Sequence, residues 1–183
     1  RTPLLVQFLV TLRCNLRRAY CENPEAAGDE LDHDEVMAML RELADAGMRK
    51  IAFGGGEPLL RKELGEWIRY ARSRRAYVNV VTNGLLLPRR VDDLAEADLV
   101  VVSIDGPEEA NDAVRGQGSY RKAVEGLRAC RERGIKTMIS AVLSSATVDH
   151  VDHILELARE LDTTAIFQPV DPGYELARPS VAD

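Results

Sequence analysis

Short apolar runs alternate with amphipathic segments along most of this chain. The runs at 50–53, 77–81 and 99–102 each pass directly into a glycine-containing or polar turn. Runs of this length, rich in valine, leucine and isoleucine, are typical of strands buried on both faces of a parallel sheet. Strands that alternate with helices form βαβ units with right-handed crossovers. The sequence therefore predicts an α/β protein.

We count about six strands, expected at 4–10, 50–53, 77–81, 99–102, 136–142 and 164–168. A complete eight-unit barrel typically needs about 250 residues, so a chain of 183 residues is too short to close one. We predict a partial (β/α)6 TIM-like barrel, an open parallel sheet with outer helices, and a doubly wound open sheet is the alternative. One core domain is expected over 1–170, followed by an irregular tail over 171–183 that contains Pro172, Gly173 and Pro179.

Helices are expected between the strands. Asp32 and Glu35 form a capping-box pattern at the start of the first one, and Gly47 ends it. The second carries Leu64 and Trp67 on its apolar face. The remaining helical segments are expected at 91–95, 120–133 and 149–161.

Charge and cysteine content limit the partners of this chain. The net charge of -6 and the pI of about 5.2 argue against binding to nucleic acid or to an anionic membrane. No apolar stretch is long enough to span a bilayer, and the N-terminus lacks the pattern of a signal peptide, so we expect a cytoplasmic protein. Three cysteines without a secretory signal favour reduced thiols over a disulfide framework.

Two of these cysteines, Cys14 and Cys21, follow the first predicted strand closely. The carboxyl ends of parallel strands are where ligands bind in α/β proteins, and two thiols there can converge on a metal. Without further context, such cysteines are more typical of small buried hydrophobic residues. Cys130 lies within a predicted outer helix, and we interpret it as a packing residue. His150 and His153 are one helical turn apart, but with no third ligand apparent we expect a solvated helix face.

The turn Gly54-Gly55-Gly56-Glu57-Pro58 comes directly after the second predicted strand. Consecutive glycines allow a close backbone approach, and the proline stiffens the exit. The turn lacks the lysine of a phosphate-binding P-loop and the spacing of a dinucleotide fingerprint. Taken alone it is a tight turn, as is Thr82-Asn83-Gly84. Asp105 and Arg115, also taken alone, are typical of a turn residue and a solvated surface arginine.

The order of these motifs at successive strand ends resembles the radical S-adenosylmethionine (radical SAM) superfamily. Cys14 and Cys21 match the first and third cysteines of the family pattern Cys-x3-Cys-x2-Cys, with its usual aromatic residue at Tyr20. The later motifs match in turn: Gly55-Gly56-Glu57-Pro58, Thr82-Asn83-Gly84, Ser103-Ile104-Asp105-Gly106 and Arg115-Gly116. The resemblance extends over 4–170.

This resemblance implies a [4Fe-4S] cluster held by Cys14 and Cys21, with S-adenosylmethionine bound beside it. In the family, one electron from the reduced cluster cleaves the sulfonium and yields a 5′-deoxyadenosyl radical. It also implies a small-molecule or peptide substrate and an electron donor such as flavodoxin or ferredoxin. The residues that it implies as cofactor contacts are Tyr20, Gly55, Gly56, Glu57, Pro58, Thr82, Asn83, Ser103, Asp105 and Arg115.

Arg18 occupies the middle position of the cysteine pattern. Iron-sulfur clusters need thiolate ligands, and a guanidinium has only donors. We therefore expect an absent or labile cluster and low activity. The alternatives are a naturally degenerate relative, a substitution or sequence error, and rescue by an unusual ligand such as Glu22. Two other functions stay open: a non-catalytic relative that binds S-adenosylmethionine or a nucleotide as sensor or scaffold, and more remotely a lyase that uses Glu57 and Asp105.

Overall fold

The computed structural model describes residues 5–16, 21, 30–145 and 147–169. Six parallel strands form one sheet in the order β1-β2-β3-β4-β5-β6, so every strand pairs with its neighbours in sequence. A doubly wound sheet would reverse its order partway, and this one does not. The open partial barrel is confirmed. The strands are β1 (Leu5–Thr11), β2 (Lys50–Gly55), β3 (Tyr77–Thr82), β4 (Leu99–Ser103), β5 (Thr137–Leu143) and β6 (Thr164–Pro169).

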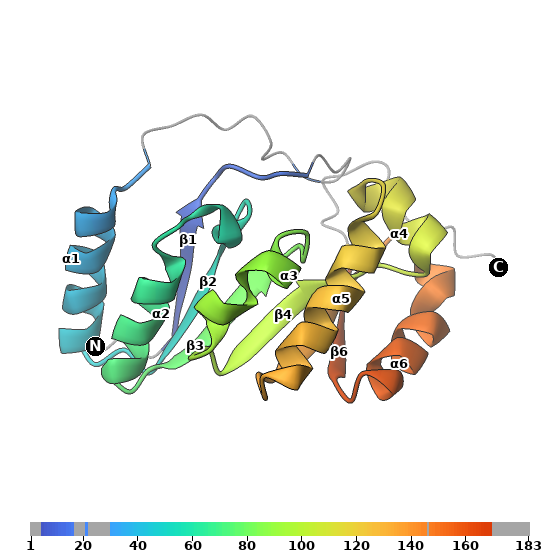
Figure 1. Ribbon diagram of the computed structural model, residues 1–183. Coiled ribbons are helices and arrows are strands. Elements are labelled where there is room, and N and C mark those ends of the chain that lie inside the picture. Colours follow the sequence, from blue (N-terminus) through green and yellow to red (C-terminus); the bar gives the residue numbers. More distant parts are fainter. Residues whose placement is uncertain (1–4, 17–20, 22–29, 146, 170–183) are drawn as a thin grey trace.

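In the described residues, six α-helices lie between the strands, and Figure 1 shows the long ones together on one face of the sheet. Short 3-10 turns occupy 58–60, 91–94 and 148–150. No helix in the described part of the chain is both long and apolar enough to cross a membrane. The helices are α1 (His33–Asp45), α2 (Leu64–Ser73), α3 (Leu87–Arg90), α4 (Glu108–Arg115), α5 (Ser119–Glu132) and α6 (Val151–Glu160).

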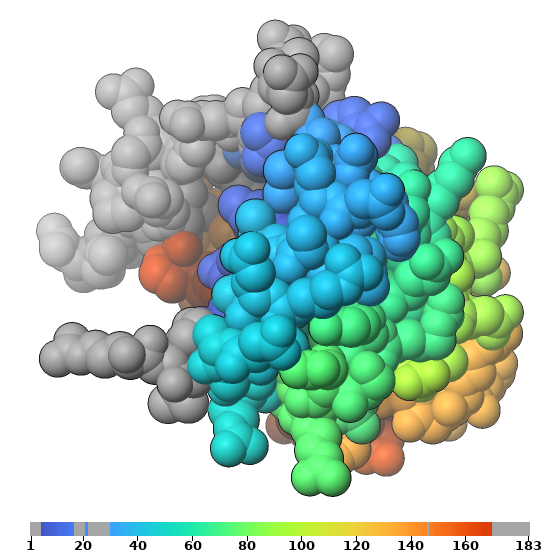
Figure 2. All heavy atoms as spheres, turned by 90° about the vertical axis from the view of Figure 1, so that its left-hand side faces the viewer, coloured from blue at the N-terminus to red at the C-terminus, as the bar shows by residue number. Residues whose placement is uncertain are grey.

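The predicted start of α1 is confirmed in atomic detail. The Glu35 amide donates to Asp32 Oδ1 at 2.9 Å, and the Asp32 amide donates to Glu35 Oε2 at 2.9 Å, which completes a capping box. Helices α1 and α2 lie side by side near the β1 edge, as Figure 2 shows. There the Trp67 indole N–H donates to His33 Nδ1 at 3.2 Å. These contacts fix α1 against the rest of the helical layer.

The core lies between the sheet and the helices. Along β3, Val78 and Val80 are fully buried beneath the helices, whereas Tyr77 and Val81 are 41% and 39% exposed on the opposite face. Leu9 of β1 is also exposed on that face. Alternate side chains of a strand point to opposite faces, and no helix of the described residues covers the second one. The uncovered face is the concave interior of the partial barrel.

Two details of the helical layer differ from the sequence prediction. The segment predicted at 91–95 is a 3-10 turn that continues from α3, so helical structure begins at Leu87. Helix α4 was not predicted because its inward side chains are polar: Asn111, Asp112 and Arg115 are buried, and no apolar stripe marks the helix. Cys130 is fully buried in α5, which confirms its packing role.

Candidate functional site at the carboxyl ends of the strands

The glycine turn packs against the chain segment that leaves β1. The Gly56 amide donates to the Thr11 carbonyl at 2.8 Å, and the Glu57 amide donates to the Arg13 carbonyl at 2.9 Å. A Cβ on Gly55 would lie 2.2 Å from the Thr11 carbonyl oxygen, and one on Gly56 would lie 2.1 Å from that of Arg13. Gly55 also has φ +125°, a region that side chains disfavour. The glycines therefore allow two backbone segments to touch.

Glu57 joins this turn to the end of β3. Its carboxylate is fully buried and accepts hydrogen bonds from Thr82 Oγ1 at 2.7 Å, the Leu59 amide at 3.1 Å and the Asn83 amide at 2.8 Å. Pro58 is buried and begins the 3-10 turn that follows. Hydrogen bonds from several donors compensate the cost of burying a carboxylate. Glu57 thus orients Thr82 and Asn83 at the next strand end.

Asn83 connects the end of β3 to the predicted cysteine ligand. Its Nδ2 donates to Asn15 Oδ1 at 2.7 Å and lies 3.8 Å from Cys14 Sγ, a long N–H···S contact. Its Oδ1 accepts from the Leu85 amide at 3.0 Å. The asparagine side chain is therefore held from both ends beside the Cys14 thiol. Hydrogen bonds to sulfur ligands are one means of tuning iron-sulfur clusters.

Cys14 and Cys21 are both half-buried and neither is in a disulfide. Arg18 and Tyr20 lie outside the described residues. Within the part of the chain that the structure describes, no group of three histidine, cysteine or acidic side chains could hold a metal ion. His150 and His153, expected on a solvated helix face, are both half-buried, and His153 Nε2 lies 3.0 Å from the Tyr120 hydroxyl. Burial raises the pKa of Tyr120, with a smaller contribution from Glu160.

Asp105 and Arg115 form a buried ion pair behind β4. Arg115 Nε lies 2.6 Å from Asp105 Oδ2, and Nη2 lies 2.9 Å from Oδ1, in a bidentate arrangement. The two side chains are 0% and 1% exposed, so the interpretation of Arg115 as a solvated surface residue is wrong. The Val142 amide donates to Asp105 Oδ1 at 2.9 Å, and the Asp105 amide donates to Asn111 Oδ1 at 3.0 Å. This network joins the ends of β4 and β5 to α4.

One donor of this network is left over. Arg115 Nη1 is buried and has no hydrogen-bond partner among the described residues. A buried unpaired donor on a charged group is costly, and a bound group commonly satisfies such a donor in native proteins. The arginine can therefore keep its bond to Asp105 and still offer one N–H to an anionic ligand.

A cavity of about 170 Å³ lies on the concave face where β1 to β4 end. Ser103, half-buried at the end of β4, lines it beside the glycine turn and the end of β3. Small side chains and bare backbone leave room for a ligand, while hydroxyl and amide groups supply hydrogen bonds. The lining residues are Gln7, Leu9, Ala52, Gly54, Gly55, Gly56, Val81, Thr82, Asn83 and Ser103.

The cavity therefore brings together residues from three separate motifs of the sequence. Gly55, Gly56, Thr82, Asn83 and Ser103 line it directly. Glu57 and Pro58 lie behind this lining, and Asp105 and Arg115 are buried in the network at the next strand end. The Cys14 thiol lies next to the lining, because its Sγ is 3.8 Å from Nδ2 of Asn83. The hydroxyl, amide and exposed backbone groups of the lining suit a polar ligand beside this thiol.

Comparison with known proteins identifies the class. The model of the radical SAM superfamily matches residues 8–158, most of the chain. The chain belongs to this superfamily, whose members bind a [4Fe-4S] cluster and S-adenosylmethionine.

Among individual proteins, PqqA peptide cyclase of Bradyrhizobium diazoefficiens is 36% identical over 168 residues, which cover 87% of this chain and 44% of the cyclase. Fe-coproporphyrin III synthase of Methanosarcina barkeri is 36% identical over 167 residues, covering 87% and 42%. This chain thus spans less than half the length of these relatives.

Among solved structures, Streptococcus suis SuiB bound to S-adenosylmethionine matches with a TM-score of 0.82 at 18% identity, covering 98% of this chain and 44% of SuiB. SuiB bound to its precursor peptide SuiA matches with a TM-score of 0.83 at 19% identity, covering 98% and 42%. At this level of identity, the match shows a shared fold.

Some residues of the site were missed by sequence analysis. Glu30 contacts the segment before Cys14, and Asn111 supports Asp105, yet neither belongs to a motif. Arg115 follows Asn111 by four positions and Asp112 by three, spacings that place each of them beside it on the same side of the helix. That polar periodicity is the signal that could have found α4. The Glu30 contact crosses 18 residues and leaves no local pattern.

Proposed function

We propose that this chain is the catalytic core of a radical SAM enzyme that modifies a peptide. The observation that carries the proposal is the cavity at the ends of β1 to β4, where the glycine turn, Thr82, Asn83 and Ser103 meet beside Cys14. PqqA peptide cyclase, at 36% identity, supports a peptide substrate, and Fe-coproporphyrin III synthase, at the same identity, makes a small molecule the alternative. The core would occupy 1–170, and a cytoplasmic home with flavodoxin or ferredoxin as electron donor belongs to the same proposal.

Each residue of the site has a distinct task in this proposal. Cys14 and Cys21 would hold iron, and Asn83 would donate toward the Cys14 sulfur. The glycine turn with Glu57 and Pro58, together with Thr82 and Ser103, would bind the methionine and ribose portions of S-adenosylmethionine, with Tyr20 beside the cluster. When bound and reduced, the cluster supplies one electron for reductive cleavage of the sulfonium.

The spare donor of Arg115 supports a contact with the cofactor carboxylate. Asp105 holds the guanidinium through Nε and Nη2, and Nη1 is buried with no partner among the residues that the structure describes. A buried N–H without a partner costs about 1–3 kcal/mol, so an anionic group that reaches it is bound more tightly. Asp105 in turn keeps Arg115 from adopting another rotamer, which makes the donor ready before the ligand arrives.

Arg18 stands in this proposal as a lesion in the cluster site. Two thiolates are fewer than the three of the family pattern, and a guanidinium cannot ligate iron. It also brings a fixed positive charge. We expect the chain as written to hold its cluster poorly.

A blocked cavity tests the proposal. In an Arg18→Cys chain reconstituted with iron and sulfide, Gly54→Val should weaken S-adenosylmethionine binding at least tenfold while iron content is unchanged. A Cβ on Gly54 meets no atom closer than 4.0 Å, so the side chain enters the cavity without backbone collision. Lys50→Val, on the same face of β2 at its other end, is the control. Equal binding by the three proteins in a calorimetric titration would contradict the cavity assignment.

A second candidate is a non-catalytic binder of S-adenosylmethionine. It is favoured by the intact glycine turn beside an incomplete cysteine pattern. Calorimetry on the cluster-free chain distinguishes the two: tight binding of S-adenosylmethionine without iron supports the sensor or scaffold, and no binding removes it.

A further inference from the structure

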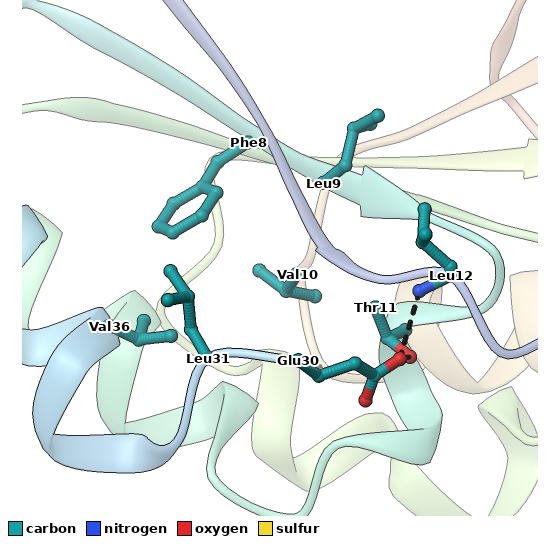
Figure 3. A pocket seen from close by; sticks show the side chains of 8 residues that line it. All are labelled: Phe8, Leu9, Val10, Thr11, Leu12, Glu30, Leu31 and Val36. Carbon is teal, nitrogen blue, oxygen red and sulfur yellow. Dashed lines mark hydrogen bonds between the residues drawn. The ribbon is translucent and has the colours of Figure 1, made fainter. Parts of the chain in front are cut away.

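Glu30 contacts the chain at the point where it leaves β1 for the cysteines. Its Oε1 accepts from Thr11 Oγ1 at 2.5 Å and from the Leu12 amide at 3.0 Å. Its Oε2 accepts from Arg13 Nε at 3.2 Å, and Arg13 Nη2 also lies 3.2 Å away. Figure 3 shows the carboxylate reaching from the start of α1 to Leu12. We call Thr11–Arg13 the loop base.

The loop base is hydrogen-bonded to two other elements, the glycine turn and Glu30. The glycine turn occupies the carbonyls of Thr11 and Arg13 through the amides of Gly56 and Glu57. On the other side Glu30 occupies the Leu12 amide and the Thr11 hydroxyl, and that hydroxyl in turn accepts from the Arg13 amide at 3.1 Å. The glycine turn thus holds Thr11 and Arg13 through their carbonyls, and Glu30 holds Thr11, Leu12 and Arg13 through other groups.

Glu30 also lies at the far end of the loop that carries both cysteines. Cys14 comes two residues after Leu12, and Cys21 comes nine residues before Glu30. The contacts therefore close the loop at its two ends. Beyond Glu30 the chain is fixed at once, because Leu31 lines an apolar pocket with Phe8, Val10 and Val36, and the capping box of α1 follows (Figure 3).

The charge of Glu30 matches its surroundings. Burial acts to raise the pKa of this carboxyl, but the hydrogen bonds from Thr11 and Leu12 and the charge of Arg13 outweigh it, and the net pKa is lowered. The carboxylate form is the one that the loop base stabilises.

We propose that Glu30 is a positioning residue that closes the cysteine loop and presents Cys14 to the site at the end of β1. That Glu30 helps to retain a cluster rests on the function proposed above. That Glu30 holds the loop base does not depend on that function. In the cluster-free chain, Glu30 restrains the backbone on which Cys14 sits. Without it, the loop base still has its hydrogen bonds to the glycine turn but loses those to Glu30.

Thiol reactivity tests this closure without any iron. In the cluster-free chain, Glu30→Ala should raise the rate of Cys14 alkylation by iodoacetamide at least threefold, measured by peptide mass spectrometry. Cys130 is the internal reference, because it is fully buried and burial raises the pKa of its thiol to about 11. Glu30→Gln should fall between the wild type and the alanine variant, since an amide keeps one acceptor but loses the charge.

The control is Glu35→Gln, which weakens the capping box of α1 but does not touch the loop base. It should leave the Cys14 rate unchanged, and hydrogen exchange at the Leu12 amide should accelerate only in the Glu30 variants. An unchanged Cys14 rate in Glu30→Ala, or an equal increase in Glu35→Gln, would overturn the proposal. An increase shared by Cys130 would show general unfolding and would also count against it.

Cluster retention is the second readout. In the Arg18→Cys chain, Glu30→Ala should at least halve the iron held after reconstitution and desalting. If Arg18→Cys alone holds no iron, the proposed function fails. The Cys14 alkylation rates still show whether Glu30 closes the loop. If iron and thiol rates are both unaffected by Glu30→Ala, the closure fails and the proposed function stands.

Discussion

Replacing Arg115 by methionine should lower the free energy of unfolding by about 3–5 kcal/mol, the cost of leaving a buried charge without its partner. Asp105 would lose its bidentate partner but keep the hydrogen bond from the Val142 amide, in a site from which water is excluded. Equilibrium unfolding in urea measures the change. The same substitution at Arg128, whose ion pair with Glu160 lies on the surface with side chains 57% and 61% exposed, should cost less than about 1 kcal/mol.

A double variant keeps this prediction testable if the single one does not fold. Arg115→Met with Asp105→Asn removes both charges, so part of the lost stability should return. If Arg115→Met is no more destabilising than Arg128→Met, the Arg115–Asp105 ion pair does not stabilise the fold as a buried pair.

The second large effect is expected at the glycine turn. In the Arg18→Cys chain, Gly56→Ala should reduce the iron retained after reconstitution at least fivefold. The added Cβ would lie 2.1 Å from the Arg13 carbonyl oxygen and 2.6 Å from that of Leu12, so backbone must move. Overpacking of this kind costs about 1–3 kcal/mol, and here the displaced backbone is the one that carries Cys14.

Gly54→Ala is the matched control, because its Cβ meets no atom closer than 4.0 Å. It should retain iron as the parent does, by colorimetric assay after desalting. Full retention by Gly56→Ala would mean that contact between the glycine turn and the loop base does not position Cys14.

The fold could be predicted from sequence because each of its units has a local pattern. Apolar runs, glycine turns and capping residues lie within a few positions of one another, and parallel order follows from their alternation. Helix α4 was not predicted in this way, because the side chains that it buries are Asn111, Asp112 and Arg115. Hydrophobic periodicity cannot detect a helix whose inner face is polar.

The site was predictable as a set of positions but not as a set of contacts. Motif order placed Glu57, Asn83 and Arg115 at strand ends, yet only the structure shows Glu57 bonded to Thr82 and Arg115 bonded to Asp105. The Glu57–Thr82 bond joins residues from different βα units, and the Arg115–Asp105 bond joins the end of β4 to the end of α4. Glu30 illustrates the limit most clearly, because its partners precede it by 17 to 19 positions.

Electron paramagnetic resonance of the reduced cluster tests the central claim most directly. The chain as written and its Arg18→Cys variant are reconstituted anaerobically, reduced, and measured with and without S-adenosylmethionine. We expect a cluster signal only in the variant, with a spectrum that changes when the cofactor is added. A full and cofactor-responsive signal with Arg18 in place would contradict the incomplete cluster site, and no signal in either protein would contradict the assignment of Cys14 and Cys21 as cluster ligands.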